Sequence, residues 1–213
     1  RFSECGATAR VAGNVHSAVV PSTDPPDETG ATMAAGATVL TGVGATANDT
    51  AINLLKYGYC YSDSATAANF MPLHRVKSNT LLDAGAETGT ITLFTPLKLA
   101  LAAGSLISYF PNPWRDVIIA AAGTVALCTG VAPLALAADA FGWLQTHGPC
   151  AVAYNATTTA IAAIGDPVAN PVNVAGAVDG MAAGTAETNQ IIGYALDVIQ
   201  ADTEMTVIFL TIE

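Results

Sequence analysis

The chain has 213 residues, of which 52% are hydrophobic and only 11% are charged, against roughly 25% in an ordinary soluble domain. Its formal net charge is −10, and residues 116–213 carry nine acidic side chains and no Lys or Arg. Because nucleic acids and anionic membranes are bound mainly through Lys and Arg, the composition argues against both as partners, and a surface with so few charges predicts assembly with other protein.

The first 35 residues show no sustained apolar periodicity. Residues 19–36, VVPSTDPPDETGATMAAG, contain three prolines among Gly, Ala and Thr. This composition is typical of extended or looped chain. We therefore expect an extended N-terminal arm over residues 1–35, followed by one β domain over residues 36–213.

Strand-like segments begin at about residue 37. They are rich in β-branched and aromatic residues, and comprise ATVLTGV (37–43), INLLKYGYCYSD (52–63) and TGTITLFTPL (88–97). Residues 95–104 have Thr95 and Pro96 where a helix would begin and Gly104 where it would end, so they are the one place where a short helix is expected.

Short strands at regular spacing are predicted for the rest of the chain. SLISYFPNPW (105–114) begins as a strand and ends in a Pro-rich turn, and the strands that follow are expected at 116–121, 124–129, 141–154, 159–164, 172–178, 190–199 and 205–212. This pattern predicts an all-β fold, a compact sandwich or barrel of short antiparallel strands with at most one short helix.

The last two segments predict a hairpin whose loop is QADTE (200–204). The final strand is apolar on both faces, since Met205, Val207 and Phe209 alternate with the three aliphatic residues Ile208, Leu210 and Ile212. Such a strand belongs in the middle of a sandwich or at a subunit interface.

The segment FGWLQTHGPC (141–150) holds the densest cluster of chemically capable side chains. As a central strand it would place Phe141, Trp143, Gln145 and His147 on one face, with Gln145 and His147 near a rim. Gly148-Pro149 is then expected to break or bulge the strand. On this interpretation the segment contributes packing rather than catalysis.

A Cys–His hydrolase is the sharpest catalytic alternative, with Cys150 as nucleophile and His147 as base. An odd spacing on a strand puts the two side chains on opposite faces, and no Lys or Arg follows Arg115 to lower the thiol pKa. A pair of carboxylates for glycoside cleavage is a second alternative, although aromatic platforms are scarce at 7%.

Metal, cofactor and targeting signals are not found in the sequence. His16, His74 and His147 are far apart, and the four cysteines (Cys5, Cys60, Cys128 and Cys150) form no CxxC pair, so we expect no metal, no cofactor and buried, unpaired thiols. No apolar run of about 18 residues and no basic segment leading into an apolar block is present, so neither a transmembrane helix nor a signal peptide is expected.

Residues 89–213 resemble the head decoration (cement) proteins of tailed bacteriophages. The resemblance lies in the order of five features, which are GTITLFTPLKLAL, SLISYFPNPWRDVI, FGWLQTHGPCAV, a Gly-rich GDPV…VAGAV stretch and the terminal IIGYALDVIQ…MTVIFLTI pair. It implies a non-enzymatic virion protein on the outer surface of the capsid, bound to the major capsid protein and to sister copies of itself, often as a trimer.

The interface and packing residues expected on this reading are aromatic, amide and aliphatic side chains of the C-terminal half. They are Trp114, Phe141, Trp143, Gln145, Ile208, Leu210 and Ile212. An alternative is a glycan- or receptor-binding β module on a virion or cell surface, for which Trp114, Trp143 and Tyr154 are the candidate aromatic residues.

Overall fold

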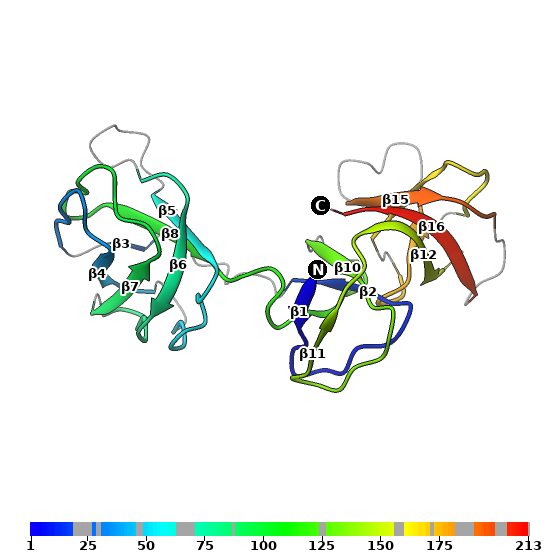
Figure 1. Ribbon diagram of the computed structural model, residues 1–213, viewed down its shortest axis with the longest axis horizontal. Coiled ribbons are helices and arrows are strands. Elements are labelled where there is room, and N and C mark those ends of the chain that lie inside the picture. Colours follow the sequence, from blue (N-terminus) through cyan, green and yellow to red (C-terminus); the bar gives the residue numbers. More distant parts are fainter. Residues whose placement is uncertain are drawn as a thin grey trace. The chain divides into compact units, whose positions relative to one another are not determined.

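The protein is all-β in a computed structural model, as the sequence predicted (Figure 1). The structure contains strands and turns, and no helix among the residues that it describes. These are residues 1–18, 27–28, 31–45, 49–62, 71–86, 88–123, 127–155, 160–170, 173–181, 190–198 and 204–212.

The chain divides into two compact units. Unit 1 combines Arg1–Val20 with Pro113–Glu213, and unit 2 consists of Pro21–Asn112. Unit 2 is therefore an insertion between the second strand of unit 1 and the rest of that unit.

Unit 1 contains three antiparallel sheets. Their orders are β1-β11, β10-β2-β9 and β12-β16-β15-β13-β14. The strands are β1 (Phe2–Glu4), β2 (Val15–Ser17), β9 (Ile118–Ile119), β10 (Cys128–Val131), β11 (Phe141–Trp143), β12 (His147–Ala153), β13 (Pro167–Ala169), β14 (Asp179–Gly180), β15 (Ile191–Ala195) and β16 (Met205–Thr211).

The three-stranded and five-stranded sheets of unit 1 share one hydrophobic core, as in a β-sandwich. Val15 of β2 and Val131 of β10 pack in the same cluster as Ile192 of β15 and Ile208 and Leu210 of β16, and all five side chains are fully buried. Each such aliphatic side chain contributes about 1.5–3 kcal/mol relative to leaving it exposed. The last strand, β16, lies between β12 and β15 in its sheet, but only its Ile208 and Leu210 side enters this core, since Met205 and Val207 on the other side are exposed.

Unit 2 is a six-stranded antiparallel sheet in the order β3-β8-β5-β6-β7-β4. Its strands are β3 (Asp27–Glu28), β4 (Val39–Val43), β5 (Tyr59–Ser62), β6 (His74–Asn79), β7 (Gly89–Leu93) and β8 (Leu106–Phe110). One face of the sheet closes over a core that includes Leu40, Val76, Ile91 and Ile107. The edge strands β3 and β4 also contact each other, so the sheet curls around this core.

The division into units differs from the predicted arm and single domain. Residues 1–18 form β1 and β2, which pair with β11, β10 and β9 of unit 1. The backbone groups of this segment are thus satisfied by residues more than a hundred positions later, which composition alone does not reveal. Residues 19–26, also assigned to the arm, lie outside the described residues.

Three local predictions also differ from the structure. Residues 95–104 form turns rather than a helix, because Leu97 and Leu101 are drawn into the core of unit 2 and bond to residues 33–37. The described parts of 159–164 and 172–178 are turns and loops rather than strands. The predicted hairpin is confirmed as a pairing, since β15 and β16 are antiparallel neighbours.

Candidate functional site

The most exposed aromatic cluster of unit 1 lies on the two-stranded ribbon of β1 and β11. Phe2, Phe141 and Trp143 are 55%, 58% and 66% exposed. The rings of Phe2 and Phe141 stack at a centroid distance of 5.9 Å and an interplanar angle of 8°, and Trp143 meets Phe2 edge-on at 5.4 Å. The three rings form one continuous patch, which we call the aromatic ribbon.

The strand period explains why these rings gather on one face. Phe141 and Trp143 are two residues apart in β11, and Phe2 lies directly opposite Trp143 in β1. The other side of the ribbon is covered by Leu136, whose side chain occupies the position that a Cβ at Gly142 would take. Gly142 therefore lets the loop before β11 pack closely and leaves the aromatic side free.

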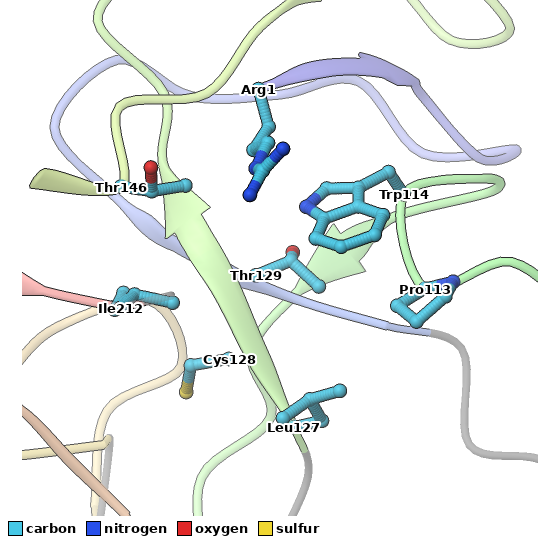
Figure 2. A pocket seen from close by; sticks show the side chains of 8 residues that line it. All are labelled: Arg1, Pro113, Trp114, Leu127, Cys128, Thr129, Thr146 and Ile212. Atoms are coloured by element: carbon cyan, nitrogen blue, oxygen red, sulfur yellow. The ribbon is translucent and has the colours of Figure 1, made fainter.

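Trp114, another residue singled out in the sequence, is half-buried beside a small cavity (Figure 2). The guanidinium carbon of Arg1 lies 5.3 Å from the centroid of its ring. The cavity has a volume of about 90 Å³ and includes Cys128 and Ile212 in its lining. It is small against the roughly 300–1,000 Å³ of ordinary ligand pockets, so it offers space for a few water molecules at most.

The segment FGWLQTHGPC does not form one central strand. The chain bends at Leu144–Thr146, because Leu144 is buried with Val117 and Ala132. The segment therefore divides between β11 and β12, and the register of β12 with β16 runs through Gly148-Pro149 without a break. Both β11 and β12 are edge strands. Proline is tolerated in an edge strand such as β12, because one side of that strand makes no ladder hydrogen bonds and needs no backbone N–H there.

Cys150 and His147 lie on opposite faces of β12. Cys150 pairs with the buried Ile208 and belongs to the core, whereas His147 pairs with the exposed Thr211 and packs edge-on against Phe209 at 5.2 Å. Burial raises the pKa of the Cys150 thiol, so the nucleophilic thiolate is disfavoured there. This geometry does not support the hydrolase arrangement.

All four cysteines are buried thiols outside any disulfide, as predicted. Burial raises the pKa of Cys60 and Cys128 to about 12. These thiols therefore pack as small apolar side chains. Within the described residues, no three His, Cys, Asp or Glu side chains gather in a way that could hold a metal ion.

The remaining candidate residues are divided between core and surface. Ile208, Leu210 and Ile212 are buried in the sandwich core, so they serve packing. The Gln145 side chain donates hydrogen bonds to the carbonyl oxygens of His147 (3.1 Å) and Pro149 (2.7 Å), which holds the bend before β12.

Tyr154 is buried, and its hydroxyl oxygen accepts a hydrogen bond from the Ile161 N–H at 2.8 Å. It therefore cannot be the exposed glycan-stacking residue that the alternative interpretation required.

Two sets of exposed residues were missed in the sequence. Phe2 lies in the segment predicted to be an arm, and no local pattern shows that it pairs with Trp143. The second set is in unit 2, where Tyr57, Tyr59 and Tyr61 alternate with smaller residues and Arg75 and Lys77 share the same period of two. That alternation was a usable signal of one aromatic and cationic sheet face.

No family model, no curated protein and no solved structure matches this chain. Among the described residues, no helix has the length and apolar character needed to cross a membrane. The geometry of the exposed surfaces, together with the sequence, is therefore the ground on which a function is proposed.

Proposed function

We propose that this chain is a structural virion protein, a decoration or cement protein on the outer face of an icosahedral bacteriophage head. In this role it binds the major capsid protein and sister copies of itself, as a trimer, and stabilises contacts between capsid subunits. It carries out no reaction and needs no cofactor, and neither nucleic acid nor membrane is among its partners.

The observation that carries the proposal is the aromatic ribbon. Three large aromatic side chains, each more than half exposed, form one patch on a chain that has only 11% charged residues. Contiguous apolar patches on soluble proteins commonly mark surfaces that bind other protein, and aromatic residues are enriched in the centres of such interfaces. The resemblance of residues 89–213 to phage decoration proteins supports a capsid as that partner.

Burial of the aromatic ribbon would supply the binding energy. Apolar surface removed from water contributes about 25 cal/mol per Å² before the costs of association are subtracted. A contact of modest strength that is repeated over a symmetric shell gains further from avidity, since several sites of one oligomer bind together.

The proposal is tested by comparing phage shells that carry the chain with shells from which it has been removed. We expect decorated shells to release their DNA at a higher temperature, and cryo-electron microscopy to place the chain on the outer face. Equal release temperatures with and without the chain would contradict the cement role.

A variant pair tests the aromatic ribbon itself. Phe141→Ser with Trp143→Ser removes two of its rings, and we expect it to lower occupancy on the shell by roughly tenfold or more. Ile164→Ser is the matched control, because Ile164 is equally exposed at 69% and belongs to no ring contact in the described structure. Equal losses in both variants would show that the ribbon is not the contact.

The same aromatic ribbon also supports a second candidate function, that of a glycan-binding module. Exposed rings can pack against the apolar faces of sugars, and Trp143 is the most exposed of the three. This candidate predicts saturable binding on a glycan array that is lost in Trp143→Ala. Shell binding without any glycan binding would exclude it.

A further inference from the structure

The outer face of the unit 2 sheet combines aromatic rings with cations. A row across β8, β5 and β6 places Phe110 beside Tyr59 and Tyr59 beside Arg75, and the N–H of Phe94 bonds to the carbonyl oxygen of Arg75. Paired residues of neighbouring strands point to the same side, so these side chains lie on one surface. Exposed Tyr61 lies on it as well, two residues further along β5. Exposed Lys77 lies next to it at a bulge of β6, where the register with β7 shifts between Val76 and Ser78.

Cations and rings are in direct contact at the centre of this surface. Tyr57 and Phe94 stack at 5.9 Å, and the guanidinium carbon of Arg75 lies 5.4 Å from the first ring and 5.6 Å from the second. The Lys56 ammonium lies 5.3 Å from the Tyr57 ring. Tyr57 has a φ of 65°, a costly conformation for a tyrosine, so the fold holds this ring in place against local strain. We call this surface the cationic face.

The described residues place no acidic side chain in an ion pair with the cations of this face. In the described part of the chain, ion pairs join Arg115 to Glu4 and to Asp116, and none involves Lys56, Arg75 or Lys77. The three side chains are exposed. Their charge is therefore available to carboxylates from outside unit 2.

Unit 1 presents a surface of the complementary kind on its five-stranded sheet. The row Pro149, Phe209 and Tyr194 crosses β12, β16 and β15, and exposed Met205, Val207 and Leu196 lie beside it. Acidic residues flank these strands, since Asp197 directly follows Leu196, Glu204 precedes Met205 and Asp166 precedes Pro167. No Lys or Arg occurs anywhere in residues 116–213. We call this surface the acidic-rimmed face.

We propose that the cationic face of one copy binds the acidic-rimmed face of a second copy of this chain. The inference rests on the proposed function in that it names the surfaces by which sister copies associate. The apolar centre of one face matches the rings of the other, and Lys56, Arg75 and Lys77 meet the carboxylates of the rim. Because the two faces differ, the contact is head-to-tail, and such contacts close into rings when the rotation between copies permits it.

Charge also argues against single-stranded nucleic acid, the main alternative ligand of the cationic face. Rings and cations on a sheet face can bind single-stranded nucleic acid, through stacking and phosphate contacts. The phosphates of a nucleic acid would extend beyond the cationic face. They would be repelled by the rest of the protein, whose net charge is −10. An acidic rim on a protein surface is local, so its charge stays within the face.

The test uses full-length chains with reversed charges and sedimentation velocity at low and high salt. Arg75→Glu with Lys77→Glu reverses the cationic face, and Asp197→Lys with Glu204→Lys reverses the rim. We expect wild type to associate more weakly as salt rises, and each reversed variant to associate roughly tenfold more weakly or worse. Lys98→Glu is the control, because this exposed lysine lies in the loop after β7 and is expected to leave association unchanged.

Mixing the two reversed variants supplies the decisive comparison. Complementary charges are then restored between copies, so association should return in the mixture and also in a chain that carries all four substitutions. The proposal would be overturned if the association constant changed neither with salt nor with the charge-reversing substitutions. It would also be overturned if the wild-type protein stayed monomeric. A single-stranded DNA oligonucleotide that binds wild type and not the Arg75→Glu/Lys77→Glu variant would overturn it as well. Failure of shell binding would overturn the proposed function alone, since association in solution is measured without shells.

Discussion

At the scale of single residues, His16 is the clearest source of pH dependence. It is fully buried on β2, the middle strand of its sheet, and its Nδ1 donates a hydrogen bond to the Asn14 carbonyl oxygen at 2.8 Å. Burial lowers its pKa from 6.5 to about 4, against the opposing effect of that hydrogen bond, and the Arg10 charge lowers it further. His16 is therefore neutral in the folded protein at pH 7.

Stability of unit 1 should fall as the pH is lowered from 6.5 toward 4. In this window the unfolded state binds the proton and the folded state does not, so the free energy of unfolding decreases by up to about 3 kcal/mol. Urea unfolding at several pH values measures the effect, and His16→Gln should flatten it. An unchanged slope in His16→Gln would contradict the assignment.

Residue type alone predicts whether some side chains are buried or exposed, but not others. Four cysteines without a CxxC pair predicted buried thiols, because an uncharged thiol behaves as a small apolar group in any core. Exposure of Phe2 and burial of Tyr154 depend on which distant segment covers each ring. No local pattern carries that information.

At the scale of elements, the alternation of apolar and polar residues predicts regular strands well and predicts bends between strands poorly. The β15–β16 pair was found because its apolar residues are continuous and its partner is adjacent in sequence. The alternation of FGWLQTHGPC, which continues through residue 147, predicts one strand. The bend is set by Leu144, which enters a small core with Val117 and Ala132, a tertiary contact that outweighs the local period.

Gly193 is the position in β15 where the sheet depends on a missing side chain. It pairs with Leu210, and a Cβ at this position would overlap the carbonyl oxygen of Phe209. We expect Gly193→Ala to destabilise unit 1 by about 1–3 kcal/mol, because the rigid backbone of β16 has to shift. Chemical unfolding measures the loss. Ala151→Val adds bulk on the exposed side of the same sheet and should stay within about 0.5 kcal/mol of wild type.

At the scale of the whole molecule, the all-β class followed from the sequence while the two units did not. Short alternating segments with Gly and Pro between them predict strands wherever they occur. The unit boundary depends on the pairing of β1 and β2 with strands beyond residue 113, and local periodicity does not report such distant partners. The Pro-rich composition after residue 20 predicts an arm, whereas unit 2 begins at Pro21.

The two units have separate hydrophobic cores, so we expect them to respond separately to core substitutions. Leu210 and Leu40 are both fully buried, the first in the core of unit 1 and the second in that of unit 2. Replacing either by Ala should lower the free energy of unfolding of its own unit by about 2–5 kcal/mol.

Two spectroscopic probes distinguish the units. Both tryptophans, Trp114 and Trp143, belong to unit 1, so their fluorescence reports unfolding of that unit, whereas far-ultraviolet circular dichroism reports both. Leu210→Ala should therefore lower the fluorescence midpoint and Leu40→Ala should leave it in place while shifting part of the dichroism change. Equal shifts of the fluorescence midpoint in the two variants would show instead that the chain unfolds as one cooperative body.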